Sequence, residues 1–244
     1  MSTVKADTVQ PKDFATDLTL GASGDTVTVA ADSININKVQ DKGGNTLWDY
    51  STGEFVSTQK EFASQNLKLL STAVASGSSS VSFTTGIDST YDVYVFKFIN
   101  MNPATDAVNF TFQVSTNGGS TYNTTLTSTA FRTYHRENDA AASLDYVSGE
   151  DQAQGTSYQI LAYGIGNDSD QCAVGELHLF SPASTVYVKP WYATTNRYFY
   201  SGSGDGTGES FFAGYFNTTT ALNAIDFKMG SGTFDGTIKM YGLL

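Results

Sequence analysis

Apolar and polar residues alternate with a period of two along most of the chain after residue 67. The segment 91–99 places three aromatic rings on one face and two valines on the other. The segment 108–114 alternates Val or Phe with Asn109, Thr111 and Gln113, which we expect to be exposed. This alternation, rich in β-branched and aromatic residues, predicts β-strands. Shorter runs of the same kind lie at 81–83, 186–188, 225–229 and 237–241.

Glycine-rich and polar segments separate these runs, notably at 117–119, 202–208 and 230–232. Such segments are typical of turns and loops. Many short strands joined by polar turns favour an antiparallel sandwich or a jelly roll. We therefore predict an all-β protein in which residues 67–244 form a β-sandwich (jelly-roll-like) head.

The first fifty residues contain only short strand-like pieces, each with too few apolar side chains for a core of its own. We predict that residues 1–50 are an attachment or oligomerisation segment and that 51–66 connect it to the head. Two arrangements would supply the missing contacts: three chains wound together, or an extended arm along a different protein. The segment 58–70 is the one stretch that predicts a helix. The apolar residues expected to be buried between chains are Leu18, Leu20, Val27, Val29, Ile34, Ile36, Val39 and Trp48.

The composition of the chain argues against several classes of function. The chain has 244 residues and a net charge of −11, because Lys and Arg are scarce. An acidic chain without a basic cluster is a poor nucleic-acid binder, and no apolar run is long enough to span a bilayer. The N-terminus lacks the apolar stretch of a signal peptide. A single cysteine, Cys172, allows neither an internal disulfide nor a multi-cysteine metal site.

The histidines give little support for catalysis. His178 alternates with Leu177 and Leu179, which places it on the face of Glu176 as a structural strand residue, and His135 stands among charged neighbours. No Gly-x-Ser-x-Gly segment occurs in the strand–turn–helix context of a serine hydrolase. We expect no enzymatic activity and no cofactor.

Three groups of acidic residues are candidate catalytic or ion-binding sites. A glycosidase needs a pair of carboxylates, and Ca²⁺ or Mg²⁺ binds carboxylate and carbonyl oxygens in loops. Neighbouring acids in Gly- and Ser-rich loops are, however, the ordinary surface of an acidic protein, and we predict no metal site. The groups are Glu150 with Asp151, Asp168 with Asp170, and Asp205 with Glu209.

Aromatic residues near the glycine-rich segment 202–208 offer the best recognition chemistry. Rings beside a loop can stack on sugars while Asn, Ser and Arg side chains bind hydroxyl groups. Trp191, Tyr198 and Tyr200 are the candidate receptor contacts. The alternative is that these rings fill the core or an intersubunit interface.

Several segments resemble tail-fibre-like structural proteins of marine tailed phages, including phages of cyanobacteria and pelagiphages. The resemblance lies in the opening segment 1–11, in 18–27, 38–48, 83–92 and 102–106, and in the C-terminal segments 213–221 and 236–242. It covers nearly the whole chain and carries no catalytic motif.

The resemblance implies a virion protein, assembled in the host cytoplasm, whose N-terminal segment is fixed to other virion proteins and whose β head faces outward. Tail fibres are commonly trimers, so the expected partners are two further copies, tail or capsid proteins, and a host-surface glycan or receptor. A capsid decoration or capsid fibre protein is the alternative, and a polysaccharide-degrading spike enzyme is a third possibility.

Overall fold

The computed structural model describes residues 38–40, 46–49, 67–199 and 204–243. The chain divides into two units, Met1–Gln59 and Lys60–Leu244. In the first unit, β1 (Lys38–Gln40) pairs antiparallel with β2 (Thr46–Asp49), and Val39 lies directly opposite Trp48. The other six predicted attachment residues, and Tyr200, lie outside the described residues. No helix in the described part of the chain is long and apolar enough to cross a membrane.

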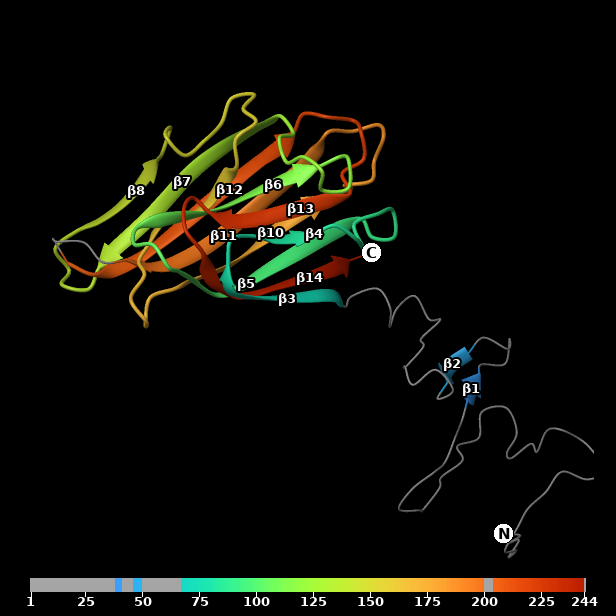
Figure 1. Cartoon of the computed structure of the whole chain (residues 1–244), viewed down its shortest axis with the longest axis horizontal. Helices are drawn as coiled ribbons and strands as arrows, with labels where there is room; N and C mark the ends of the chain where they lie inside the picture. Colours follow the sequence, from blue (N-terminus) through green and yellow to red (C-terminus); the bar gives the residue numbers. More distant parts are fainter. Residues whose placement is uncertain (1–37, 41–45, 50–66, 200–203, 244) are drawn as a thin grey trace, which may run out of the picture. The chain divides into compact units, whose positions relative to one another are not determined.

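The second unit is an antiparallel β-sandwich, which confirms the predicted fold class (Figure 1). Its large sheet has eight strands in the order β3-β14-β5-β10-β11-β12-β7-β8. In chain order these strands are β3 (Lys68–Ser78), β5 (Val93–Pro103), β7 (Leu126–Arg136), β8 (Ala142–Tyr146), β10 (Ala173–Phe180), β11 (Lys189–Phe199), β12 (Gly206–Phe216) and β14 (Phe234–Leu243).

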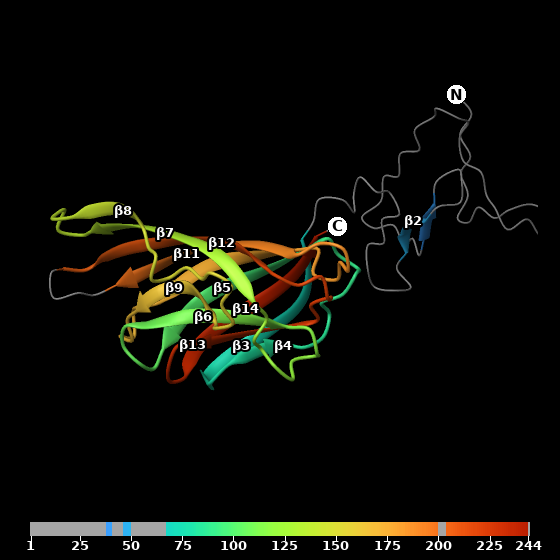
Figure 2. The same cartoon turned by 90° about the horizontal axis from the view of Figure 1, so that it is seen from above.

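The small sheet has four strands in the order β4-β13-β6-β9. They are β4 (Val81–Phe83), β6 (Val108–Ser115), β9 (Gln159–Ile165) and β13 (Ala224–Met229). The strands of both sheets can be followed from a second direction in Figure 2. We call the face of each sheet that looks toward the other sheet its inner face.

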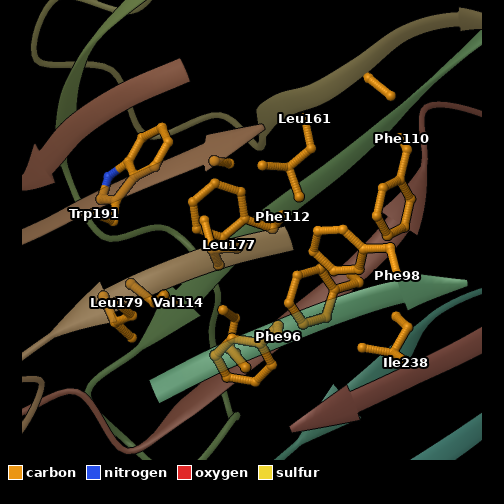
Figure 3. Close-up of a cluster of buried hydrophobic side chains, with 14 of the residues drawn as sticks. Phe96, Phe98, Phe110, Phe112, Val114, Leu161, Leu177, Leu179, Trp191 and Ile238 are labelled. Carbon is orange, nitrogen blue, oxygen red and sulfur yellow. The ribbon is translucent and has the colours of Figure 1, made fainter. Parts of the chain in front are cut away.

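Aromatic rings from both sheets interlock between the inner faces (Figure 3). The ring of Phe227 on β13 is fully buried and lies 5.4 Å from Phe96 and 5.3 Å from Phe98, both on β5. Phe112 on β6 meets Trp191 on β11 edge to face at 5.0 Å. Such ring pairs add to the burial energy that holds the layers together.

Two predictions about individual segments are wrong. The expected helix at 58–70 is contradicted at its end, because residues 68–70 begin strand β3 and pair with β14. Pairing with a neighbouring strand overrides local helical propensity here. The segment 186–188 is not a strand: Val186 and Tyr187 are exposed, and β11 begins only at Lys189.

Thr111 and Gln113 were expected to be exposed, but both are buried. The amide nitrogen of Gln113 donates to the backbone carbonyls of Thr124, Thr156 and Ser157 at 3.1–3.2 Å. The two connecting segments that carry these carbonyls therefore cover the outer face of the small sheet at β6. The alternating pattern correctly places Thr111 and Gln113 on the outer face of β6, but it does not indicate that other segments of the chain bury this face.

Candidate functional site

The large sheet has twice as many strands as the small one, so part of its inner face extends beyond the edge strand β9. A cavity of about 250 Å³ lies in this uncovered region. The chain contains three arginines in all, Arg132, Arg136 and Arg197, and all three line this cavity. We call the cavity the arginine recess; its other lining residues are Thr133, Tyr134, Tyr163, Phe199, Gly208, Glu209 and Ser210.

Strand register builds the floor of the recess. Gly208 on β12 lies between Arg197 on β11 and Tyr134 on β7, directly opposite both. One step along, Gly206 lies between Phe199 and Arg136 in the same way. Residues directly opposite in a sheet share a face, so two glycines stand between larger side chains in adjacent rows. Gly208 lines the cavity, and its missing side chain leaves part of the space that the cavity occupies, whereas the ring of Phe199 lies over Gly206.

Arg132 is fixed by a buried carboxylate. Its Nη1 lies 2.6 Å from Oε1 of Glu150, whose side chain is only 4% exposed. Burial raises the pKa of the Glu150 carboxyl, and the charges of Arg132 and Arg197 oppose that shift. Glu150 does not line the recess, so it acts behind the arginines and does not face a ligand.

Arg197 is the most deeply buried cation of the recess, at 9% exposed. Its Nη1 donates to the carbonyl of Gly164 at 3.1 Å, and its Nε has no hydrogen-bond partner. The guanidinium carbon lies 4.8 Å from the ring centre of Phe199 and 5.7 Å from that of Tyr163. Burial and the nearby Arg132 lower the pKa of Arg197 to about 10, which leaves it cationic at neutral pH.

Glycine at 208 keeps this guanidinium group uncovered on one side. A Cβ at position 208 would lie 3.5 Å from Cζ, Nε and Nη2 of Arg197, which is ordinary van der Waals contact. The recess thus combines planar cations, aromatic rings and hydroxyl groups, a combination that recognises an anion on a small polar molecule.

Two of the predicted receptor contacts, Trp191 and Tyr198, lie among the described residues, and neither lines the arginine recess. Trp191 is 2% exposed and fills the core beside Phe112, the alternative that the sequence left open, so it is not available at the surface (Figure 3). The hydroxyl of Tyr198 donates to Asp205 Oδ2 at 2.6 Å, and this bond raises the pKa of Tyr198 to about 12. Tyr198 alternates with Arg197 and so stands on the opposite face of the sheet from the recess.

His178 lies on strand β10, on the face opposite Leu177 and Leu179 as predicted, and its Nε2 lies 3.0 Å from Glu176 Oε1. His135 lies 3.2 Å from Asp139 at the surface.

The acidic groups do not meet in one place. Asp151 accepts a hydrogen bond from Tyr146, and Asp168 accepts one from Gln171. Glu209 alternates with Gly208 and Ser210, so its side chain stands on the outer face. Among the residues described, no group of three or more His, Cys, Asp or Glu side chains is arranged to hold a metal ion.

The sequence analysis did not predict the arginine recess, although one sequence feature points to it. Arg132 and Arg136 are four residues apart in an alternating strand and therefore share a face. Gly206 and Gly208 were assigned to a loop, whereas they begin β12. Nothing local in the sequence indicates that β12 pairs with both β7 and β11, and this pairing is what assembles the site.

Comparison with protein-family models, curated proteins and solved structures finds no match to this chain. The functional argument therefore depends on the residues and geometry described above.

Proposed function

We propose that this protein is a non-enzymatic, tail-fibre-like structural component of a phage virion that displays its β-sandwich head outward to bind a host-surface glycan. The arginine recess supports this proposal best. An acidic chain gathers every arginine that it has into one cavity, which lies beyond the edge of the small sheet and has aromatic walls.

The recess has features of a binding site and lacks those of a glycosidase. Glycoside hydrolysis uses two carboxyl groups on either side of the scissile bond. Glu209 is the sole acidic residue among the described residues that line the recess, and its side chain stands on the other face of β12. The nearby Glu150 is paired with Arg132 behind the cavity wall.

The N-terminal unit is proposed to attach the chain to other virion proteins and to associate three copies. The paired strands β1 and β2 comprise seven residues in two short runs, and a two-stranded hairpin is marginal in water without further contacts. Contacts from neighbouring copies or from a tail or capsid protein would supply the missing burial.

Two measurements test the proposal. Purified full-length protein in excess should slow adsorption of the phage to its host, and unchanged adsorption would contradict host-surface binding. Gold-labelled antibodies against the protein should decorate the tail in electron micrographs of intact particles. Labelling of the shell would instead establish a capsid decoration protein.

A further inference from the structure

The guanidinium group of Arg197 is built for a ligand that the described residues do not supply. More than nine-tenths of this residue is buried, yet its Nε has no hydrogen-bond partner. Leaving a buried charged donor unsatisfied is costly. Glycine at 208 also leaves open the space over the same group.

The charged residues around the recess indicate which kind of anion it binds. Three guanidinium groups line it, one carboxylate is buried behind it at Glu150, and a second stands at Asp145, directly opposite Arg132 on the edge strand β8. Arg132 is therefore already paired with a carboxylate, whereas the Nε of Arg197 has no hydrogen-bond partner. A ligand with one carboxylate would supply the acceptor that the Nε of Arg197 lacks.

The volume and lining residues of the recess indicate which class of molecule bears this carboxylate. Its volume of about 250 Å³ lies just below the roughly 300–1,000 Å³ of pockets for drug-sized molecules, so it accommodates one small unit. Tyr163 is 40% exposed, and the hydroxyl-bearing residues Tyr134 and Ser210 line the cavity on the same face as Arg132. Aromatic faces and hydroxyl groups around a cation are suited to a sugar ring.

We infer that the arginine recess binds a hexuronic acid unit of a host-surface polysaccharide, with Arg197 and Arg132 holding its carboxylate. This inference rests on the proposed function and specifies its ligand class. Bidentate Arg–carboxylate pairing supplies both energy and orientation. The requirement for a planar fork means that lysine at position 197 would not substitute for arginine.

The test uses the full-length chain and three oligosaccharide probes: trimers of galacturonate, glucuronate and mannuronate. Each is compared with the neutral trimer obtained by reducing its carboxyl groups, and binding is measured by isothermal titration calorimetry. At least one acidic trimer should bind about tenfold or more tighter than its reduced partner, the expected effect of a charge-assisted hydrogen-bond pair.

Two variants localise the binding. Gly208→Ala adds a methyl group over Arg197 without a close contact and without a strained backbone, and Arg197→Lys keeps the charge but removes the fork. Both should weaken binding of the acidic trimer about tenfold. Gly230→Ala is the matched control, because its Cβ would lie 3.7 Å from the Asn109 carbonyl, away from the recess.

Each outcome is decisive. Equal binding of an acidic trimer and its reduced partner overturns the carboxylate inference but leaves glycan binding in place. Binding by neither class overturns the inference, while the adsorption assay judges the proposed function separately. Wild-type affinity in both Gly208→Ala and Arg197→Lys would locate the ligand elsewhere and would also overturn it.

Discussion

A buried amide, Gln159, connects the two sheets beside the arginine recess. Its Nε2 donates to the backbone carbonyl of Glu150 at 2.9 Å, and its Oε1 accepts the hydroxyl proton of Ser128 at 2.6 Å. Gln159 lies on the small sheet and Ser128 on the large one, and Gln159 is fully buried. This amide therefore fixes the segment that places Glu150 behind Arg132.

Replacing Gln159 with leucine keeps the approximate side-chain size and removes both of these hydrogen bonds, together with the one that Nε2 donates to the Ile160 carbonyl at 3.1 Å. Each buried group left without a partner costs about 1–3 kcal/mol. Burial of the leucine side chain offsets about 1.5–3 kcal/mol of that loss. We expect a net loss of about 2 kcal/mol, equivalent to a fall in Tm of about 4–8 °C for a chain of this size.

Urea unfolding followed by tryptophan fluorescence measures this loss. Trp191 is 2% exposed in the sandwich core and reports on it directly, and a Trp48→Phe background removes the signal of the other unit. Ser128→Ala removes the hydroxyl that Gln159→Leu leaves unpaired, but it also removes the acceptor of the Gln152 backbone N–H at 3.0 Å. The double variant should therefore lose about 1 kcal/mol less stability than the sum of the two single variants. A single variant as stable as the wild type, or strictly additive effects, would refute the proposed connection.

Three further predictions address the core, the pH response and the domain boundary. Phe227→Ala should lower the free energy of unfolding in urea by about 3–5 kcal/mol, because the Phe227 ring is fully buried among five other rings. Phe131 is 43% exposed on the outer face, so Phe131→Ala should lower it by about 1 kcal/mol. The reverse order would contradict the assigned core. The hydrogen bond from His178 lowers the pKa of Glu176, so the stability that this carboxylate contributes is complete above its ordinary value near 4.5 and is lost as the pH falls through the lower folded value. Glu176→Gln should therefore show a smaller loss of stability between about pH 5 and 3 than the wild type, and an unchanged acid dependence would contradict this assignment. Deleting residues 1–50 should leave the far-ultraviolet circular dichroism of the β head intact while preventing incorporation into virions; an unfolded product would show that the boundary is misplaced.

The alternating pattern predicted the fold class because most strands of the sandwich keep one face in the core. Tyr94, Phe96 and Phe98 point inward as expected, and the runs at 225–229 and 237–241 lie within β13 and β14. A period of two is a local property, and it is preserved whatever partner each strand acquires.

The pattern fails where burial depends on distant parts of the chain. Gln113 reads as exposed, yet connecting segments from two other regions cover it and supply three carbonyl partners. Arg136 on β7 and Arg197 on β11 are more than sixty positions apart in the chain, and they share the recess because β12 pairs with both strands. Trp191 shows the same limit, because a ring that stacks on a sugar and a ring that fills a core look identical in sequence.

Folding stability alone gives no reason for arginine at position 197. Burial is the main cause of the lowered pKa of this residue, so its charge costs folding free energy where it lies. An apolar side chain of similar length would bury comparable surface without that cost, and replacing buried charges by apolar groups is often neutral or stabilising. The chain nonetheless gathers its three arginines here and leaves glycine where a side chain would cover one of them. A charge kept at the expense of stability, beside an open cavity, is better explained by recognition of an external anion than by packing.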